Sequence, residues 1–204
     1  PKSEKKADYL KSLGIDKTVY QVIHEMEMPF DWIPKLAAYS TRKGIMFLST
    51  PFDEASADQL DPHIAAYKIA SYEMTHYPLI EHVARRGKPL MISTGGATMA
   101  EVEDMVAHVA RTGSRALCVL QCTAKYPAPP DSLNMNVIDT FRARWGFPVG
   151  FSDHSLDPAL APLVAVAKGA RILEKHFTLS RGLPGPDHTY ALEPAELTEM
   201  VRQI

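Results

Sequence analysis

The sequence predicts an α/β protein, a (β/α)8 TIM-type barrel of which this chain supplies about six β-α units. Short apolar runs alternate with amphipathic stretches at intervals of about 20–30 residues, the pattern of parallel strands joined by helices. No G-x-G-x-x-G follows the first apolar run, which disfavours an open dinucleotide-binding sheet. Polar side chains follow every run instead, as expected for a barrel whose βα loops build the active site.

Six short runs predict strands that are buried on both faces, because each is apolar and bounded by turn or polar residues. They are residues 45–48, 66–70, 89–92, 116–121, 148–151 and 171–174. An eight-stranded barrel typically has about 250 residues, and this chain has 204. We therefore expect residues 1–204 to form a partial barrel domain, with the first two strands missing before residue 1.

Four helical patterns each stop close to a glycine. They cover residues 31–42, 78–86, 100–111 and 157–168, and Gly44, Gly87, Gly113 and Gly169 follow them. Glycine adopts the left-handed conformation that commonly ends a helix, so these positions support the helix assignments. Residues 126–136 include Pro127, Pro129 and Pro130 and are expected to form an ordered loop.

Composition narrows the class of protein. A formal net charge of -2 argues against a nucleic acid or an anionic membrane as the main partner. No apolar run approaches the roughly 20 residues that span a bilayer, and the charged N-terminus has no signal-peptide core behind it. Cys118 and Cys122 fit neither a C-x-x-C zinc pair nor a disulfide framework. We therefore expect a cytoplasmic protein with reduced cysteines.

Lys68 lies within an apolar run, three residues before Ser71. A buried lysine is costly unless an anion or a carboxylate pairs with it. One interpretation is a phosphate or carboxylate site, with serine and threonine hydroxyls and glycine-loop amides as further donors. The other is a lysine at a strand end that extends its ammonium group to solvent. The pattern leaves both open.

His154 and His176 end consecutive predicted strands, one β-α unit apart, so we expect them to be neighbours at the rim of the barrel. Two imidazoles on rigid strand ends can hold a divalent metal and leave positions open for water and substrate. Hydrogen-bonded structural histidines are the alternative. Asp153 and Glu174 are either further ligands or partners that orient the imidazoles, and spacing alone does not separate these roles.

Residues 183–188 form a rigid turn after the last predicted strand, because Pro184 and Pro186 fix the backbone and Gly185 permits a sharp bend. The turn is either only a connection or a means of presenting Asp187 and His188 to the site. Its place above the last strand favours the second interpretation.

Six motifs occur in the order in which they occur in sialic-acid synthases. They are YKIAS (67–71), STG (93–95), CTAKYPAP (122–129), GFSDH (150–154), EKHF (174–177) and PGPDH (184–188). The chain resembles that family from about Met28 to its end, and several motifs in one order make the resemblance specific. Within the family it looks most similar to synthases of spore-coat polysaccharide biosynthesis, with pseudaminic and legionaminic acid synthases close behind.

The resemblance implies condensation of phosphoenolpyruvate with the aldehyde of an N-acylated hexosamine. The products would be phosphate and a nine-carbon 2-keto-3-deoxy sugar acid for surface or spore-coat polysaccharide. It also implies a divalent metal, usually Mn²⁺ with Mg²⁺ or Co²⁺ as alternatives, held by His154 and His176, and a homodimer in the full-length protein. The metal would act as a Lewis acid on the aldehyde oxygen.

The resemblance assigns the remaining site residues as well. Phosphoenolpyruvate would be bound by Thr50, Lys68, Ser71, Ser93 and Ser152. The sugar would be bound by Glu73, Tyr126 and Asp187. The implied catalytic residues are Lys68, Glu73, His154, His176 and Asp187.

Three departures from the family pattern keep other functions open. The family's first two strands, which carry a glutamate and a second lysine, and its C-terminal antifreeze-like domain are not found in this sequence, and Ala124 stands where some members have asparagine. The alternatives are a related condensing enzyme with another aldehyde, an aldolase that uses Lys68 as a Schiff base, and a non-catalytic barrel that binds a sugar acid.

Overall fold

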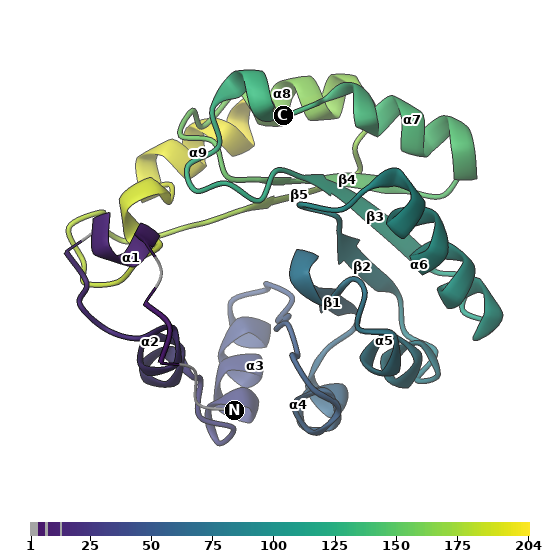
Figure 1. Cartoon of the computed structure of the whole chain (residues 1–204), viewed down its shortest axis with the longest axis horizontal. Helices are drawn as coiled ribbons and strands as arrows, with labels where there is room; N and C mark the ends of the chain where they lie inside the picture. Colours follow the sequence, from purple (N-terminus) through teal and green to yellow (C-terminus); the bar gives the residue numbers. More distant parts are fainter. Residues whose placement is uncertain (1–3, 7, 13) are drawn as a thin grey trace.

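A computed structural model of the chain describes residues 4–6, 8–12 and 14–204. Five parallel strands form one sheet in the order β1-β2-β3-β4-β5. The strands are β1 (Tyr67–Ile69), β2 (Leu90–Ser93), β3 (Leu117–Cys122), β4 (Val149–Asp153) and β5 (Ile172–Lys175). The sheet curls into an arc with helices on its convex side, so the chain forms a half-barrel (Figure 1).

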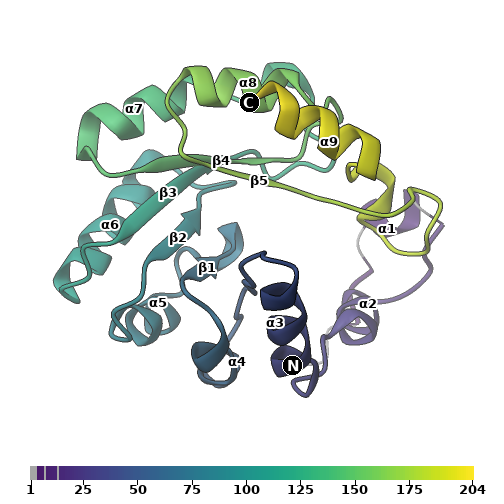
Figure 2. The ribbon, with the colours of Figure 1, turned by 180° about the vertical axis from the view of Figure 1, so that it is seen from behind.

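The helices between consecutive strands cover the convex side of the sheet, and both views show the same arrangement (Figure 2). The α-helices are α1 (Asp8–Ser12), α2 (Val19–Met26), α3 (Trp32–Arg42), α4 (Glu54–Leu60), α5 (Tyr77–Ala84), α6 (Met99–Arg111), α7 (Asn136–Trp145), α8 (Leu160–Ala167) and α9 (Pro194–Gln203). Short 3-10 turns are η1 (Asp61–His63), η2 (Ser71–Glu73), η3 (Pro130–Ser132) and η4 (His188–Tyr190). Alternation of parallel strands with helices confirms the predicted α/β class.

The core lies between the sheet and the helices. Ile69 and Ile92 of the sheet are fully buried, as are Leu79 of α5 and Met105 of α6. Strands β4 and β5 approach closely because Gly150 has no side chain: a Cβ there would lie 2.7 Å from the carbonyl oxygen of Ile172. Close approach at this point brings the ends of β4 and β5 together, where the predicted histidines follow.

The prediction of a strand at residues 45–48 is wrong. These residues form no strand, and Ile45 and Met46 are 67% and 68% exposed. A strand needs a neighbour to complete its hydrogen-bond ladder, and within the described part of the chain no strand pairs with this segment. The described residues therefore form five strands where the sequence predicted six.

The four predicted helices are present as α3, α5, α6 and α8, and the four glycines after them have positive φ angles of 71°, 74°, 83° and 89°. Helix α8 begins three residues later than predicted. Asp157 accepts hydrogen bonds from the backbone N–H groups of Ala159 and Leu160, at 2.8 and 2.7 Å, and so caps the helix from outside it. Helix α7 was not predicted, although Gly146 ends it in the left-handed conformation.

The proline-rich segment 126–136 is mainly a loop, as predicted, and its Tyr126–Pro127 bond is cis. It contains η3 and leads into α7. Cys118 and Cys122 are both free and buried. In the part of the chain that the structure describes, no helix combines the length and apolarity that crossing a bilayer requires.

Candidate active site

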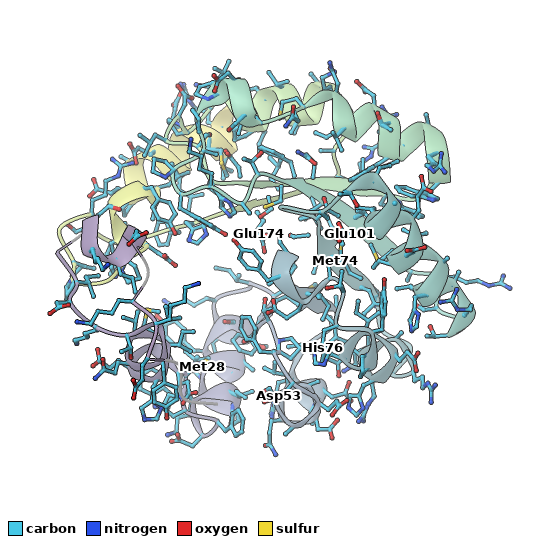
Figure 3. The ribbon with its side chains drawn as sticks, viewed as in Figure 1. Met28, Asp53, Met74, His76, Glu101 and Glu174 are labelled. Carbon is cyan, nitrogen blue, oxygen red and sulfur yellow. The ribbon has the colours of Figure 1, made fainter. Side chains whose placement is uncertain are left out.

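The ends of β4 and β5 place side chains alternately on the two faces of the sheet. Ser152 and Glu174 are aligned across the two strands, and Asp153 and Lys175 are aligned at the next position. Glu174 contacts Lys68 of β1, at the far end of the sheet, so it lies on the concave side. Figure 3 shows Glu174 on that side, below β5. Because side chains alternate along a strand, Asp153 and Lys175 lie on the convex side.

The Lys68 ammonium group is surrounded by hydrogen-bond acceptors on the concave side. Its Nζ donates to Ser93 Oγ at 2.8 Å and to the carbonyl of Ile69 at 2.9 Å, and it lies 3.5 Å from Glu174 Oε2. Ser152 Oγ donates to the same Glu174 oxygen at 2.6 Å. Lys68 and Ser152 thus contact one carboxylate oxygen, and Ser93 contacts the lysine.

The lysine does not reach solvent by extending along the surface, because its side chain is only 10% exposed. The structure therefore argues against the second interpretation of Lys68, a lysine that extends its ammonium group to solvent. The first interpretation, an anion site, stays a prediction.

Ser71 and Cys122 lie beside this cluster. The backbone N–H of Gly95 donates to Ser71 Oγ at 2.9 Å, and the Cys122 thiol contacts both Ser71 and Ser152. A Cβ at Gly95 would lie 2.9 Å from Ser71 Oγ and 3.0 Å from Cys122 Sγ, so only glycine lets this loop approach so closely. Burial raises the pKa of Cys122, which keeps the thiol neutral.

The two predicted histidines are neighbours, with ring centroids 5.2 Å apart. His154 Nδ1 lies 2.8 Å from the carbonyl oxygen of Thr123. Since a carbonyl only accepts, Nδ1 carries the proton and Nε2 keeps its lone pair. His176 Nδ1 lies 3.7 Å from Asp187 Oδ2. Burial lowers the pKa of both imidazoles, which favours the neutral form that binds metals.

Two tyrosines enclose the imidazoles. The Tyr126 ring centroid lies 4.1 Å from that of His154 and 6.0 Å from that of His176. The Tyr190 ring lies 5.0 Å from His176 and 5.5 Å from Tyr126. Burial raises the pKa of Tyr126, so its hydroxyl stays protonated. Tyr190 was not predicted, because a single aromatic residue after the Asp187 turn reads as core.

Glu73 and Thr50, two further predicted site residues, make no hydrogen bond to the cluster around Lys68 within the described part of the chain. Glu73, at the end of η2, is partly buried, and its Oε2 has no hydrogen-bond partner among the described residues. Burial raises the pKa of Glu73. Thr50 lies in the extended segment before α4, and no hydrogen bond in the described structure joins it to Lys68, Ser71 or Ser93.

The donor set at the histidines fits a divalent metal with open positions. In the described ranges no group of three or more His, Cys, Asp or Glu residues is close enough to enclose an ion. Two neutral imidazoles, at least one with Nε2 free, leave room for water or substrate as further ligands. Asp153 does not serve as a third ligand, since it faces the helices and contacts Lys175 at 2.6 Å.

A cavity of about 520 Å³ lies next to this site and is mainly apolar. Its lining includes Pro127, Leu133, Leu156 and Leu160, and none of Lys68, His154 or His176. The polar cluster at the strand ends, rather than this cavity, is therefore the candidate active site.

The comparisons with known proteins agree on one family. The sequence model of the NeuB family matches residues 1–204. The spore coat polysaccharide biosynthesis protein SpsE of Bacillus subtilis is 44% identical over 200 residues, which cover 96% of this chain and 53% of that protein. N,N'-diacetyllegionaminic acid synthase of Campylobacter jejuni is 35% identical, over 98% of this chain and 61% of that enzyme. The chain thus spans about half the length of the curated relatives it matches.

Solved structures show the same relationship. The N-acetylneuraminic acid synthetase of Leptospira borgpetersenii, in complex with citrate, superposes with a TM-score of 0.87 at 32% identity, covering 96% of this chain and 68% of that one. A truncated 3-deoxy-D-arabino-heptulosonate 7-phosphate synthase of Thermotoga maritima has a TM-score of 0.76 at 15% identity, over 99% of this chain and 82% of that one, and shares the fold alone. On sequence and structure together, this chain belongs to the NeuB family.

Proposed function

We propose that this chain forms part of the catalytic barrel of an enzyme that condenses phosphoenolpyruvate with an N-acylated hexosamine aldehyde. The products are phosphate and a nine-carbon 2-keto-3-deoxy sugar acid, which is used in polysaccharide biosynthesis. One observation carries the proposal: a buried lysine–hydroxyl cluster and a pair of neighbouring histidines lie close together, since Cys122 contacts Ser152 of the cluster and its Sγ lies 3.9 Å from His154 Nδ1. The synthases named among the relatives support the sugar-acid product.

The lysine cluster is proposed to bind phosphoenolpyruvate. Lys68 and Ser152 contact the Glu174 carboxylate, and Ser93 contacts Lys68. An incoming phosphate or carboxylate would take the place of Glu174 beside these side chains. Ser71 and the amide of Gly95 lie alongside and would hold a second oxygen. Thr50 is a further proposed donor. Fixing both charged groups of the substrate holds its C3 in position for attack.

The histidine pair is proposed to hold Mn²⁺, with Mg²⁺ or Co²⁺ as alternatives. When bound, the metal supplies Lewis acidity to the aldehyde oxygen of the sugar. The chain's own part is orientation: the Thr123 carbonyl fixes the tautomer of His154 and Tyr126 packs against its ring.

The proposed reaction balances with one water molecule. The C3 carbon of phosphoenolpyruvate forms a bond to the aldehyde carbon, and the positive charge that develops at C2 is quenched by water. The tetrahedral intermediate at C2 then expels phosphate and leaves the keto group. Lys68 and the hydroxyls stabilise the phosphate throughout.

Sugar binding is proposed for Glu73, Tyr126 and Asp187. Glu73 Oε2 is buried and has no hydrogen-bond partner among the described residues. A buried oxygen without a partner is costly, and a hydrogen bond from a sugar hydroxyl to Glu73 would relieve that cost. Asp187 is mostly exposed and lies beside His176, where it can meet a sugar at the mouth of the site. In the complete protein we propose a closed barrel, a homodimer and a cytoplasmic location.

The test is phosphate release from phosphoenolpyruvate by the complete protein, with Mn²⁺ and a panel of N-acyl hexosamines. Lys68→Met should raise the KM for phosphoenolpyruvate by about 10–100-fold, the worth of a hydrogen bond to a charged group. Lys88→Met is the matched control, since Lys88 precedes β2 at the opposite end of the strands and pairs with Asp61. Absence of phosphate release with every sugar would overturn the proposal. Borohydride trapping of a sugar adduct on Lys68 would favour the aldolase instead.

A further inference from the structure

A buried ion pair joins β4 and β5 on the face opposite the candidate site. Lys175 Nζ lies 2.6 Å from Asp153 Oδ2, and the two side chains are 5% and 2% exposed. The residues are aligned partners in the sheet. Helix α8 runs across the convex side of these strands (Figure 2).

The pair is part of a closed hydrogen-bond network. Lys175 also donates to the carbonyl of Ser155 at 2.6 Å and lies 3.4 Å from that of Asp157. The N–H of Ser155 donates to the other Asp153 oxygen, Oδ1, at 2.8 Å. The loop after β4 therefore curls around the ammonium group.

The sheet ends at this position. Asp153 and Lys175 are the last aligned residues of β4 and β5, and His154 and His176 follow directly. Beyond it the backbones take different partners. The His154 carbonyl accepts from the N–H of Ala128, whereas the His176 carbonyl accepts from the N–H of Leu192. The ion pair is thus the final tie between the two strands before each histidine.

Stability alone does not explain such a pair. The cost of removing two charges from water is about as large as their attraction, and a well-packed apolar pair often serves as well or better. A pair that fixes one arrangement of two neighbouring strands has a different use, since the distance between the next two side chains depends on it.

We propose that Asp153 and Lys175 are positioning residues that hold His154 and His176 at the separation a divalent metal requires. The inference rests on the proposed metal site. Residues that orient metal ligands from behind typically contribute about 10–100-fold to metal affinity or activity.

The experiment replaces both charges, because removing one would leave the other buried and unpaired. In the complete protein, Asp153→Asn/Lys175→Met should bind Mn²⁺ about 10–100-fold more weakly than the native protein by titration calorimetry. The matched control is Asp139→Asn/Lys168→Met, which removes a pair of the same residue types and the same 2.6 Å length between α7 and the C-cap residue of α8. The control should bind Mn²⁺ with native affinity.

A metal-free measurement separates positioning from ligation. Ring signals of His154 and His176 in the NMR spectrum of the metal-free protein should each be a single sharp set in the native protein and the control. They should broaden or split in the Asp153→Asn/Lys175→Met protein. If that variant fails to fold, Asp153→Asn/Lys175→Gln, which also removes both charges but keeps acceptor and donor groups at the site, should weaken Mn²⁺ binding toward the lower end of the range.

Native Mn²⁺ affinity together with unchanged ring signals in the double variant would overturn the inference. Equal weakening in the control would do the same, because it would point to a general loss of rigidity. A native protein that binds no Mn²⁺ would overturn the proposed metal site itself, which is a distinct result.

Discussion

The end of β4 and the segment 45–52 have a similar sequence pattern but opposite structures. Each is a short run of apolar residues followed by hydroxyl groups. Strand β4 lies between β3 and β5 and is buried along its length, whereas Ile45 and Met46 are exposed and belong to no strand. The difference lies in the neighbours: a strand needs at least one neighbour to complete its hydrogen-bond ladder, and β4 has two. The candidate site lies at the ends of the paired strands.

The largest expected effect is at the end of β4, which His154 follows. His154→Ala in the complete protein should lower kcat/KM by about 1,000-fold, because Lewis-acid stabilisation is worth several kcal/mol, and should abolish Mn²⁺ binding. His108→Ala is the control, since His108 lies on α6 and pairs with Glu81 on the outer surface. Product formation at the native rate by the His154 variant would remove this residue from the metal site.

A pair of apolar truncations tests the comparison directly. Ile92→Ala, at a fully buried position in β2, should lower the free energy of unfolding by about 2–5 kcal/mol. Met46→Ala, in the unpaired segment, should change it by less than about 0.5 kcal/mol. Urea unfolding of both variants measures the difference. Equal losses would mean that residues 45–48 are packed as firmly as the sheet.

An effect between those of Ile92→Ala and Met46→Ala is expected at the border between the two regions, where Asp61 anchors β1. Its carboxylate accepts a hydrogen bond from the buried Tyr67 hydroxyl at 2.7 Å and lies 3.0 Å from Lys88 Nζ. Asp61→Asn should lower the free energy of unfolding by about 1 kcal/mol at pH 7.

This contribution depends on pH in a defined direction. The hydrogen bond from Tyr67 lowers the pKa of Asp61 below its ordinary value of 3.8. The carboxylate therefore stabilises the fold above that pH, and the stabilisation is lost as the pH falls through the lowered pKa. The difference in unfolding free energy between the native protein and Asp61→Asn should shrink below about pH 3.8. A constant difference down to pH 2 would contradict this assignment.

Most of the fold could be predicted from local pattern. Five of the six strands and the ends of four helices follow from apolar runs and from glycines that adopt positive φ angles. The strand prediction for residues 45–48 was wrong although their local pattern is that of a strand. Only a long-range property, the absence of a pairing neighbour in the described chain, decides against it. Helix α7 was overlooked because the preceding prolines dominated the interpretation of its segment, although Gly146 marks its end.

Part of the candidate site could also be predicted from local pattern. Motif spacing predicted that Lys68, Ser93, Ser152, His154 and His176 meet at one rim. In the structure they are connected through Glu174 and Cys122. Spacing did not tell Asp153 from Glu174, since adjacent positions on a strand differ only in the face they occupy. That assignment needed the contact between Lys68 and Glu174 across the concave side. Tyr190 depended on the path of the chain after β5, which local pattern does not determine.

Gly150 has a consequence for mutational scanning. Any side chain at this position would meet the carbonyl oxygen of Ile172 and the side chain of Leu120, so β4 and β5 would separate just before the two histidines. A scan of the complete protein that measures product formation would therefore score every substitution at position 150 as low as substitutions of a residue that contacts substrate. Measuring protein abundance alongside product formation would distinguish them: Gly150 variants should lose both, whereas variants of His176 should lose only product formation.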